Sequence, residues 1–288
     1  MIVDSHQHFW DLERFPYPWM SDELHAIRRN FGPKDLEPLL VERGVDRSVV
    51  VQATSSTDET RYLLEIAART DFVCGVVGWA DIADPGVSAV ISDLRNGEGG
   101  DYLVGMRHQV HDEADPDWLL RDEVQRGLQE LADAGLAYDL LVRARELPAA
   151  LLTARAQPRL RLVIDHIAKP PIRERVMDEW ARAMAPFAEL DNVYCKLSGM
   201  VTEADWTAWE TADLVPYVER VIDWFGEDRI MFGSDWPVCL LAASYKEVVD
   251  ALESALGPLG ESARAKIYGG NAVAFYQLGD AWGVPTSR

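Results

Sequence analysis

Histidines at strand-like spacing are the first chemically active feature of the sequence. His6 and His8 flank Gln7 at the end of an apolar N-terminal run. Side chains at i and i+2 of a strand point to the same face, so both imidazoles can converge on one point. His166 ends the segment LVIDH, and Asp235 ends the segment IMFGSD. Three imidazoles and one carboxylate suit a single divalent ion such as Zn²⁺. The same cluster could also activate water without metal, as a charged and hydrogen-bonded site.

Further polar residues end other apolar runs. Arg107 and Lys196 could each bring a positive charge to a developing oxyanion or to a carboxylate product, although Lys196 could instead simply pair with a carboxylate. His108 follows Arg107 directly, so the two face opposite sides of a regular strand, and we expect Arg107 to line the site. Gln52 could reach a substrate hydroxyl or bond to a neighbouring strand.

Two acidic residues lie inside the same runs. Asp139 and Asp165 could orient the histidines from behind. His166 is expected to face the site. Strand alternation therefore predicts that its neighbour Asp165 faces away from the mouth.

Eight short apolar runs rich in β-branched residues carry these groups. Several are nearly continuous, which fits parallel strands buried on both faces. The runs are Ile2–His8, Ser48–Ala53, Val73–Ala80, Leu103–Val110, Ala137–Val142, Arg161–Ile167, Val193–Ser198 and Ile230–Trp236.

Helical spacing fills the segments between the runs. Thr60–Arg69 and Glu123–Ala134 have the pattern of amphipathic helices, the second ending at a capping Gly135. Ser244 begins a further helix with capping-box spacing. Repeated strand–helix alternation predicts a single-domain (β/α)8 TIM-type barrel over residues 1–288, with a doubly wound open sheet as the alternative. In a barrel, the carboxyl ends of all strands form one ring, which would bring His6, His8, His166 and Asp235 together.

An aromatic-rich loop follows the first run. In a barrel, the loop Phe9–Pro33 leaves the mouth of the first strand, where long loops shape active sites. We expect it to line a substrate pocket; the alternative is a rigid, proline-pinned plug. The expected substrate-binding residues are Trp10, Arg14, Tyr17 and Trp19 of the loop, together with Gln52 and Trp236.

Composition excludes some partners. The chain has 28 Lys and Arg against 48 Asp and Glu, a formal net charge of −20. This balance argues against nucleic acid and against an anionic membrane surface. Neither a membrane-length apolar run nor a leader-like N-terminus occurs, so we expect a cytoplasmic protein. The sequence is compatible with a homo-oligomer.

Five segments give the chain a family resemblance. They are DSHQHFWD, LVIDHIAKP, VYCKLSGM, RIMFGSDWPV and YGGNAVAFY. In this order they resemble the amidohydrolase superfamily, and more narrowly its branch of L-fuconolactonase, L-rhamnonolactonase and pyrone dicarboxylate lactonase types. The resemblance runs from Ile2 to about Leu278.

The resemblance implies a distorted barrel with the site at the strand carboxyl ends. It assigns His6 and His8 to the first strand, His166 to the sixth and Asp235 to the eighth. The run Ala137–Val142 has no histidine, and the run Leu103–Val110 has no lysine that could bridge two metals. One divalent ion, Zn²⁺ in the first instance, is therefore expected rather than two, and it could be dispensable.

The resemblance and the residues together favour a lactonase. Asp235 is the expected general base that takes a proton from water. Few arginines end the runs and aromatic residues are plentiful, which favours a neutral sugar lactone of the L-fucono-, L-rhamnono- or L-galactono- type. The alternatives are a hydrolase of an acidic lactone or an amide, a metal-dependent decarboxylase of an aromatic acid, and a catalytically silent binding protein.

Overall fold

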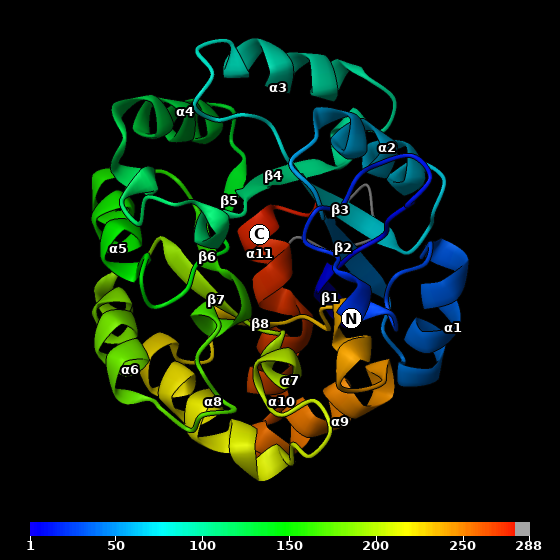
Figure 1. Cartoon of the computed structure of the whole chain (residues 1–288), viewed down its shortest axis with the longest axis vertical. Coiled ribbons are helices and arrows are strands. Elements are labelled where there is room, and N and C mark those ends of the chain that lie inside the picture. Colours follow the sequence, from blue (N-terminus) through cyan, green and yellow to red (C-terminus); the bar gives the residue numbers. More distant parts are fainter. Residues whose placement is uncertain (280–288) are drawn as a thin grey trace.

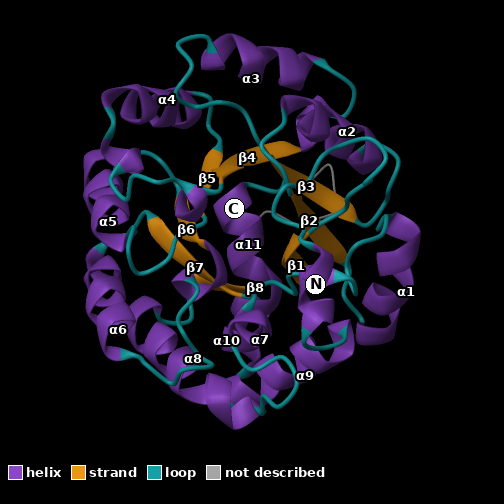
Figure 2. Cartoon of the chain, in the orientation of Figure 1, coloured by secondary structure: helices purple, strands orange, loops and turns teal. Residues whose placement is uncertain are grey.

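Eight parallel strands form the centre of the fold in the computed structural model, which describes residues 1–279. Each strand is hydrogen-bonded to the next one in chain order, and helices surround the ring (Figure 1, Figure 2). The predicted (β/α)8 barrel is thereby confirmed. The strands are β1 (Val3–Gln7), β2 (Arg47–Val51), β3 (Val73–Gly78), β4 (Leu103–His108), β5 (Ala137–Leu140), β6 (Leu162–Ile164), β7 (Val193–Leu197) and β8 (Ile230–Phe232).

Helices follow the strands around the outside. They are α1 (Pro33–Arg43), α2 (Thr57–Ala67), α3 (Val87–Asn96), α4 (Asp122–Asp133), α5 (Leu147–Ala156), α6 (Asp178–Met184), α7 (Met200–Glu203), α8 (Thr211–Phe225), α9 (Tyr245–Leu256), α10 (Glu261–Ala265) and α11 (Asn271–Tyr276). The predicted caps are present. Gly135 after α4 has a φ of 69°, and the Ser244 side chain accepts from the Glu247 N–H at the start of α9. These local signals fix where the helices begin and end.

Each of the eight predicted runs overlaps one strand, and each continues past the residue where that strand ends. β8 ends at Phe232, whereas the predicted run continues to Trp236. The chain leaves the strand there, and Asp235 takes a left-handed φ of 56°. β6 likewise ends at Ile164, and His166 has a φ of 52°. His166 and Asp235 therefore lie just past the strand ends, whereas His6, Arg107 and Lys196 lie on β1, β4 and β7.

Between β8 and β1 the barrel is closed in part by side-chain hydrogen bonds, whereas backbone ladders join the other neighbouring strands. Within residues 1–279 no ladder joins the two strands, and Gln7 of β1 instead forms an isolated bridge with Trp236, four residues past the end of β8. Side chains complete the seam. The Ser5 hydroxyl donates to the Phe232 carbonyl at 2.6 Å, and the buried Asp4 carboxylate accepts from the Ser234 N–H at 2.9 Å. This seam runs beside His6 and Asp235, so it sets their separation.

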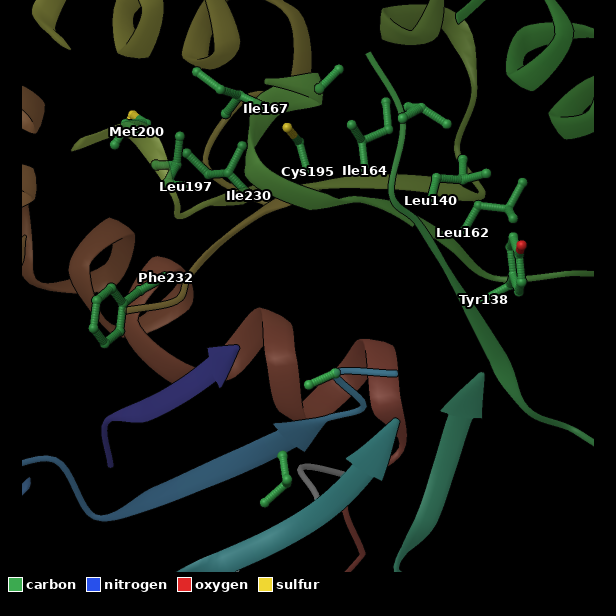
Figure 3. Packing of buried hydrophobic residues seen from close by; sticks show 14 of the residues in the cluster. Tyr138, Leu140, Leu162, Ile164, Ile167, Cys195, Leu197, Met200, Ile230 and Phe232 are labelled. Carbon is green, nitrogen blue, oxygen red and sulfur yellow. The ribbon is translucent and has the colours of Figure 1, made fainter. Parts of the chain in front are cut away.

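Two apolar layers hold the barrel. The larger layer lies between the strands and the outer helices, and Figure 3 shows part of it along β5 to β8, from Tyr138 to Phe232. The smaller one fills the barrel, where strand residues such as Val49, Val163 and Met231 pack against Phe275 of α11. The C-terminal helix therefore lies within the ring of strands (Figure 1).

Residues 280–288, which the predicted domain includes, lie outside the described residues. In the part that is described, no helix combines the length and apolar character needed to cross a membrane.

Candidate active site

The two histidines of β1 face the same point at the carboxyl end of the barrel. Their Nε2 atoms are 3.2 Å apart, and both side chains are buried. Gln7 between them points to the other side of the strand, where its amide donates to the Ser48 hydroxyl at 3.2 Å. The structure therefore brings His6 and His8 together as the spacing predicts.

Asp235 and His166 reach the same point from the turns after β8 and β6. The Asp235 Oδ1 atom lies 3.3 Å from the Nε2 of His8, and 3.8 Å from the Nε2 atoms of both His6 and His166. The left-handed turns direct these two side chains inward, and the Asp235 N–H donates to the His6 carbonyl at 2.8 Å. One carboxylate oxygen and three imidazole nitrogens thus face one centre.

The outer nitrogen of each imidazole has its own partner. His8 Nδ1 lies 2.7 Å from the Val51 carbonyl, which can only accept, so the Nδ1 carries the proton. His166 Nδ1 lies 2.9 Å from the Ser198 hydroxyl, and His6 Nδ1 lies 3.2 Å from Asp165 Oδ1. Such partners fix the ring orientations, with the Nε2 atoms turned towards the centre.

Burial sets the charge of these groups. Burial lowers the pKa of His6 and His166 well below the usual value, so both rings are neutral. Burial raises the pKa of Asp235, but the neighbouring His166 and His8 outweigh burial and bring the pKa below the usual value. Neutral imidazoles with an ionised carboxylate are the forms that bind a divalent cation.

His6, His8 and Asp235 fit a zinc site, and His166 lies 3.8 Å from its carboxylate oxygen. Two ligands on a tetrahedral zinc, each about 2.0–2.1 Å from the metal, lie about 3.4 Å apart. The observed separations of 3.2 and 3.3 Å match that value, and those of 3.8 Å exceed it slightly. His6, His8 and Asp235 are close enough to share one ion.

A buried charge network supports His6 from below. The Lys196 ammonium lies 2.6 Å from Asp139, 3.0 Å from Asp165 and 3.0 Å from His6 Nδ1. Arg107 joins the network, 3.1 Å from Asp165 and 3.2 Å from the His6 Nε2. Lys196 is fully buried and not among the cavity-lining residues, so it holds His6 rather than reaching a substrate.

The prediction that Asp165 faces away from the mouth is wrong. Asp165 points inward, where its carboxylate contacts His6, Arg107 and Lys196. Strand alternation does not apply because β6 ends at Ile164 and the chain turns at the next residue. Burial raises the pKa of Asp165, but Lys196 and His6 lower it well below the usual value, so the carboxylate is ionised.

A cavity of about 150 Å³ opens above this cluster. Loops after β1, β2, β4, β5, β6 and β8 form its walls. The lining residues are His8, Trp19, Ala53, Arg107, Gln109, His111, Asp112, Leu141, His166, Lys169, Asp235 and Val238.

Of the aromatic residues expected to bind substrate, Trp19 lines the cavity. Its indole N–H donates to the Ala53 carbonyl at 2.7 Å, which fixes the ring at the rim. Trp10 and Tyr17 are buried within the loop Phe9–Pro33, and the Trp10 N–H donates to the Arg29 carbonyl. Trp236 is buried against the Phe31 ring. The loop thus combines the two expected roles, because Trp19 lines the pocket and the other rings form a packed plug.

Arg14 and Gln52, the polar residues expected to bind substrate, are not among the residues that line the cavity. Arg14 is exposed and stacks on the Tyr62 ring, 4.4 Å from its centroid. Gln52 is buried behind Arg107, whose guanidinium donates to the Gln52 carbonyl. The Gln52 side-chain amide donates in turn to the Arg107 carbonyl at 3.2 Å, so Gln52 bonds to β4 and positions Arg107.

Four polar lining residues escaped the sequence analysis. Gln109, His111 and Asp112 belong to the turn after β4, and Lys169 lies in a left-handed stretch with a φ of 47°. Their position at or just beyond the end of a predicted run was the available signal. Burial, with the nearby Lys169 and Arg143, lowers the pKa of His111 to about 3, so its ring is neutral.

Comparisons with known proteins show which family the chain resembles. A family model described as amidohydrolase matches residues 3–278. An L-fucono-1,5-lactonase of Burkholderia ambifaria is 43% identical over 286 residues, covering 96% of this chain and 95% of that protein. An L-fucono-1,5-lactonase of Burkholderia multivorans is 38% identical over 287 residues, covering 96% of each.

A solved structure extends the likeness to the fold. An amidohydrolase from Burkholderia multivorans with bound zinc superimposes with a TM-score of 0.91 at 36% identity, covering 97% of this chain and 100% of that chain. The resemblance of the five sequence segments is thereby confirmed. The chain belongs to the amidohydrolase family.

Proposed function

We propose that this protein hydrolyses a neutral sugar lactone, with L-fucono-1,5-lactone as the first candidate. The observation that carries the proposal is the convergence of an ionised Asp235 and the imidazoles of His6, His8 and His166 at the floor of an open cavity. The two relatives named L-fucono-1,5-lactonase match this chain over almost its whole length, which supports the choice of substrate.

Asp235 is the proposed general base. Its ionised carboxylate lines the cavity and takes a proton from a water molecule as the water oxygen bonds to the lactone carbonyl carbon. The ring C–O bond then breaks, and Asp235 returns the proton to the departing ring oxygen. The product is an open-chain hydroxy acid, which ionises by releasing one proton to solvent.

Arg107 is the proposed partner of the carbonyl oxygen. It lines the cavity beside His6, and its charge stabilises the oxyanion that develops on attack. A zinc ion held by His6, His8, His166 and Asp235 would supply Lewis acidity and lower the pKa of water towards 7. The chain's own residues orient the water and the lactone in either case.

The charges of the cavity wall favour a neutral substrate. Arg107 pairs with Asp165 at 3.1 Å and Lys169 pairs with Glu203 at 2.5 Å. The other charged lining residues, Asp112 and Asp235, are acidic. Among the described lining residues an anionic substrate would therefore find no cation without a carboxylate partner. Trp19 offers a ring face to the apolar side of a sugar.

A panel of substrates tests the proposed function. Acid release is followed with a pH indicator for L-fucono-, L-rhamnono- and L-galactonolactones, for a pyrone dicarboxylate, and with carbon dioxide detection for dihydroxybenzoates. We expect rapid acid release from one or more neutral lactones. Turnover of only the pyrone dicarboxylate, or carbon dioxide from an aromatic acid, would overturn the proposal.

We also expect one zinc ion per chain. Titration of the metal-depleted protein with Zn²⁺ should give a stoichiometry of one, because the four donors face a single centre. His8→Ala should weaken zinc binding at least about tenfold by removing a ligand. His25→Ala is the matched control, since His25 lies in an exposed turn. Binding of two ions, or unchanged binding in the His8 variant, would contradict this site.

Gly199 is expected to be essential for the position of His166. Gly199 has a φ of 62°, and a Cβ there would lie 2.5 Å from the His166 Nδ1. We expect Gly199→Ala to displace the ring from Ser198 and lower the rate of lactone hydrolysis at least about tenfold, as loss of a ligand's orienting partner does.

Gly44→Ala is the control for backbone strain. Gly44 has a φ of 63° in the same left-handed region as Gly199, and no other described part of the chain comes within 4 Å of the place where a Cβ would lie. Both variants carry the left-handed cost of about 1–2 kcal/mol, so their unfolding midpoints should fall. Equal rates of lactone hydrolysis in the two variants would refute the role of Gly199.

A further inference from the structure

The C-terminal helix enters the barrel from the end opposite the cavity. Asn271, at the start of α11, donates to the Ile230 carbonyl of β8 at 2.6 Å. Phe275 and Tyr276 then pack among barrel residues such as Val49 and Val163. Figure 1 shows α11 within the ring of strands. The segment YGGNAVAFY, residues 268–276, is thus docked beneath the active site rather than on the outer surface.

Tyr276 is the residue of this helix that reaches the buried charges. Its hydroxyl lies 2.9 and 2.8 Å from the two carboxylate oxygens of Asp139 and donates to them. The Lys196 ammonium lies 5.5 Å from the centroid of the Tyr276 ring, within the range of a cation–π contact. Tyr276 therefore contacts both members of the Asp139–Lys196 pair.

The pair continues to the site. Asp139 holds the Lys196 ammonium at 2.6 Å, and Lys196 lies 3.0 Å from the His6 Nδ1. Asp139 and Lys196 are fully buried, so neither can exchange its partner for water. Burial raises the pKa of Asp139 to about 6 against the lowering effect of Lys196. The ionised form of Asp139 thus depends on the donors around it.

We propose that Tyr276 is a positioning residue for the active site. It fixes Asp139, which fixes Lys196, and Lys196 with Asp165 fixes the orientation of the His6 ring. The effect expected on kcat rests on the proposed lactone hydrolysis. The effect expected on zinc binding rests only on the imidazoles and carboxylate of the site. The C-terminal helix is then part of the catalytic apparatus, although it makes no contact with the cavity.

Tyr268 provides a matched control at the other end of the same segment. It is 2% exposed, as Tyr276 is, and its hydroxyl has no hydrogen-bond partner among the described residues. Tyr268→Phe and Tyr276→Phe each remove one buried hydroxyl from the C-terminal segment. Of these two hydroxyl groups, only that of Tyr276 is hydrogen-bonded to the buried charge network.

The test compares these two variants with the unmodified protein. For Tyr276→Phe we expect kcat to fall about tenfold, the lower limit for residues that support a ligand from behind. The KM should stay unchanged, since Tyr276 does not line the cavity. The dissociation constant for Zn²⁺, measured by competition with a chromogenic chelator, should rise. Tyr268→Phe should match the unmodified protein in all three quantities.

A further variant and the zinc measurement keep the inference separate from folding and from the proposed function. Asp139→Asn should reproduce the effect of Tyr276→Phe on kcat and on zinc binding, because it breaks the same chain one step nearer to His6. If the unmodified protein hydrolyses no lactone, the proposed function fails and zinc binding alone decides. Equal zinc affinity and equal kcat for Tyr276→Phe and Tyr268→Phe would overturn the inference.

Discussion

Asp235→Asn is expected to lower kcat for lactone hydrolysis by about 10³-fold, within the range for loss of a general base. The amide keeps the size of the carboxylate but cannot accept the proton of the attacking water. Its oxygen is also a weaker partner for the imidazoles of His6, His8 and His166, which surround Asp235 Oδ1 at 3.3 to 3.8 Å. The measurement is kcat and KM at saturating Zn²⁺, so that weaker metal binding does not limit the rate.

Asp112→Asn is the matched control for this result. Asp112 also lines the cavity, but its carboxylate is 63% exposed and its nearest basic partner is His111, 3.6 Å away. We expect its kcat to stay within a few-fold of the unmodified enzyme, because it does not face the cluster of imidazoles. Similar losses in the two variants would mean that negative charge in the cavity matters and that proton transfer by Asp235 does not.

Lys196→Met is expected to destabilise the fold by about 3–5 kcal/mol, the usual result of removing one partner from a buried ion pair. Lys196 is fully buried between Asp139 and Asp165, at 2.6 and 3.0 Å. Without the ammonium, two buried carboxylates would face each other with fewer positive partners. Urea unfolding at constant pH measures the loss of free energy of unfolding.

Lys246→Met separates this effect from the loss of any lysine. Lys246 pairs with Asp250 on the outside of α9, and its side chain is 54% exposed. Exposed pairs of this spacing contribute about 0.3–0.5 kcal/mol, so the variant should be nearly as stable as the unmodified protein. If Lys196→Met were no more destabilising than Lys246→Met, the buried network would not have the role assigned to it.

The sequence predicts the barrel and the central cluster well because both depend on local patterns. Apolar runs mark each strand, and the carboxyl ends of barrel strands meet in one ring. His6 and His8 are two residues apart on one strand, so their convergence follows from strand geometry alone. His166 and Asp235 follow runs whose ends are equally clear, and the structure brings all four residues together.

The surroundings of the cluster depend on backbone turns and long-range packing, which local patterns do not encode. Asp165 points inward because β6 ends one residue before it. Trp10 and Trp236 are buried where the aromatic loop folds back on itself and on the turn after β8, so their residue type alone suggested substrate stacking. Tyr276 reaches Asp139 across 137 positions of sequence. Such contacts follow only from the closed barrel.

The most direct test of the account is the ring opening of L-fucono-1,5-lactone, followed by nuclear magnetic resonance with the unmodified protein and with Asp235→Asn. The account predicts that the unmodified protein forms the open-chain acid far faster than the spontaneous reaction does. It also predicts that the variant stays close to the spontaneous rate. A spontaneous rate with the unmodified protein, or full activity in the variant, would contradict the account.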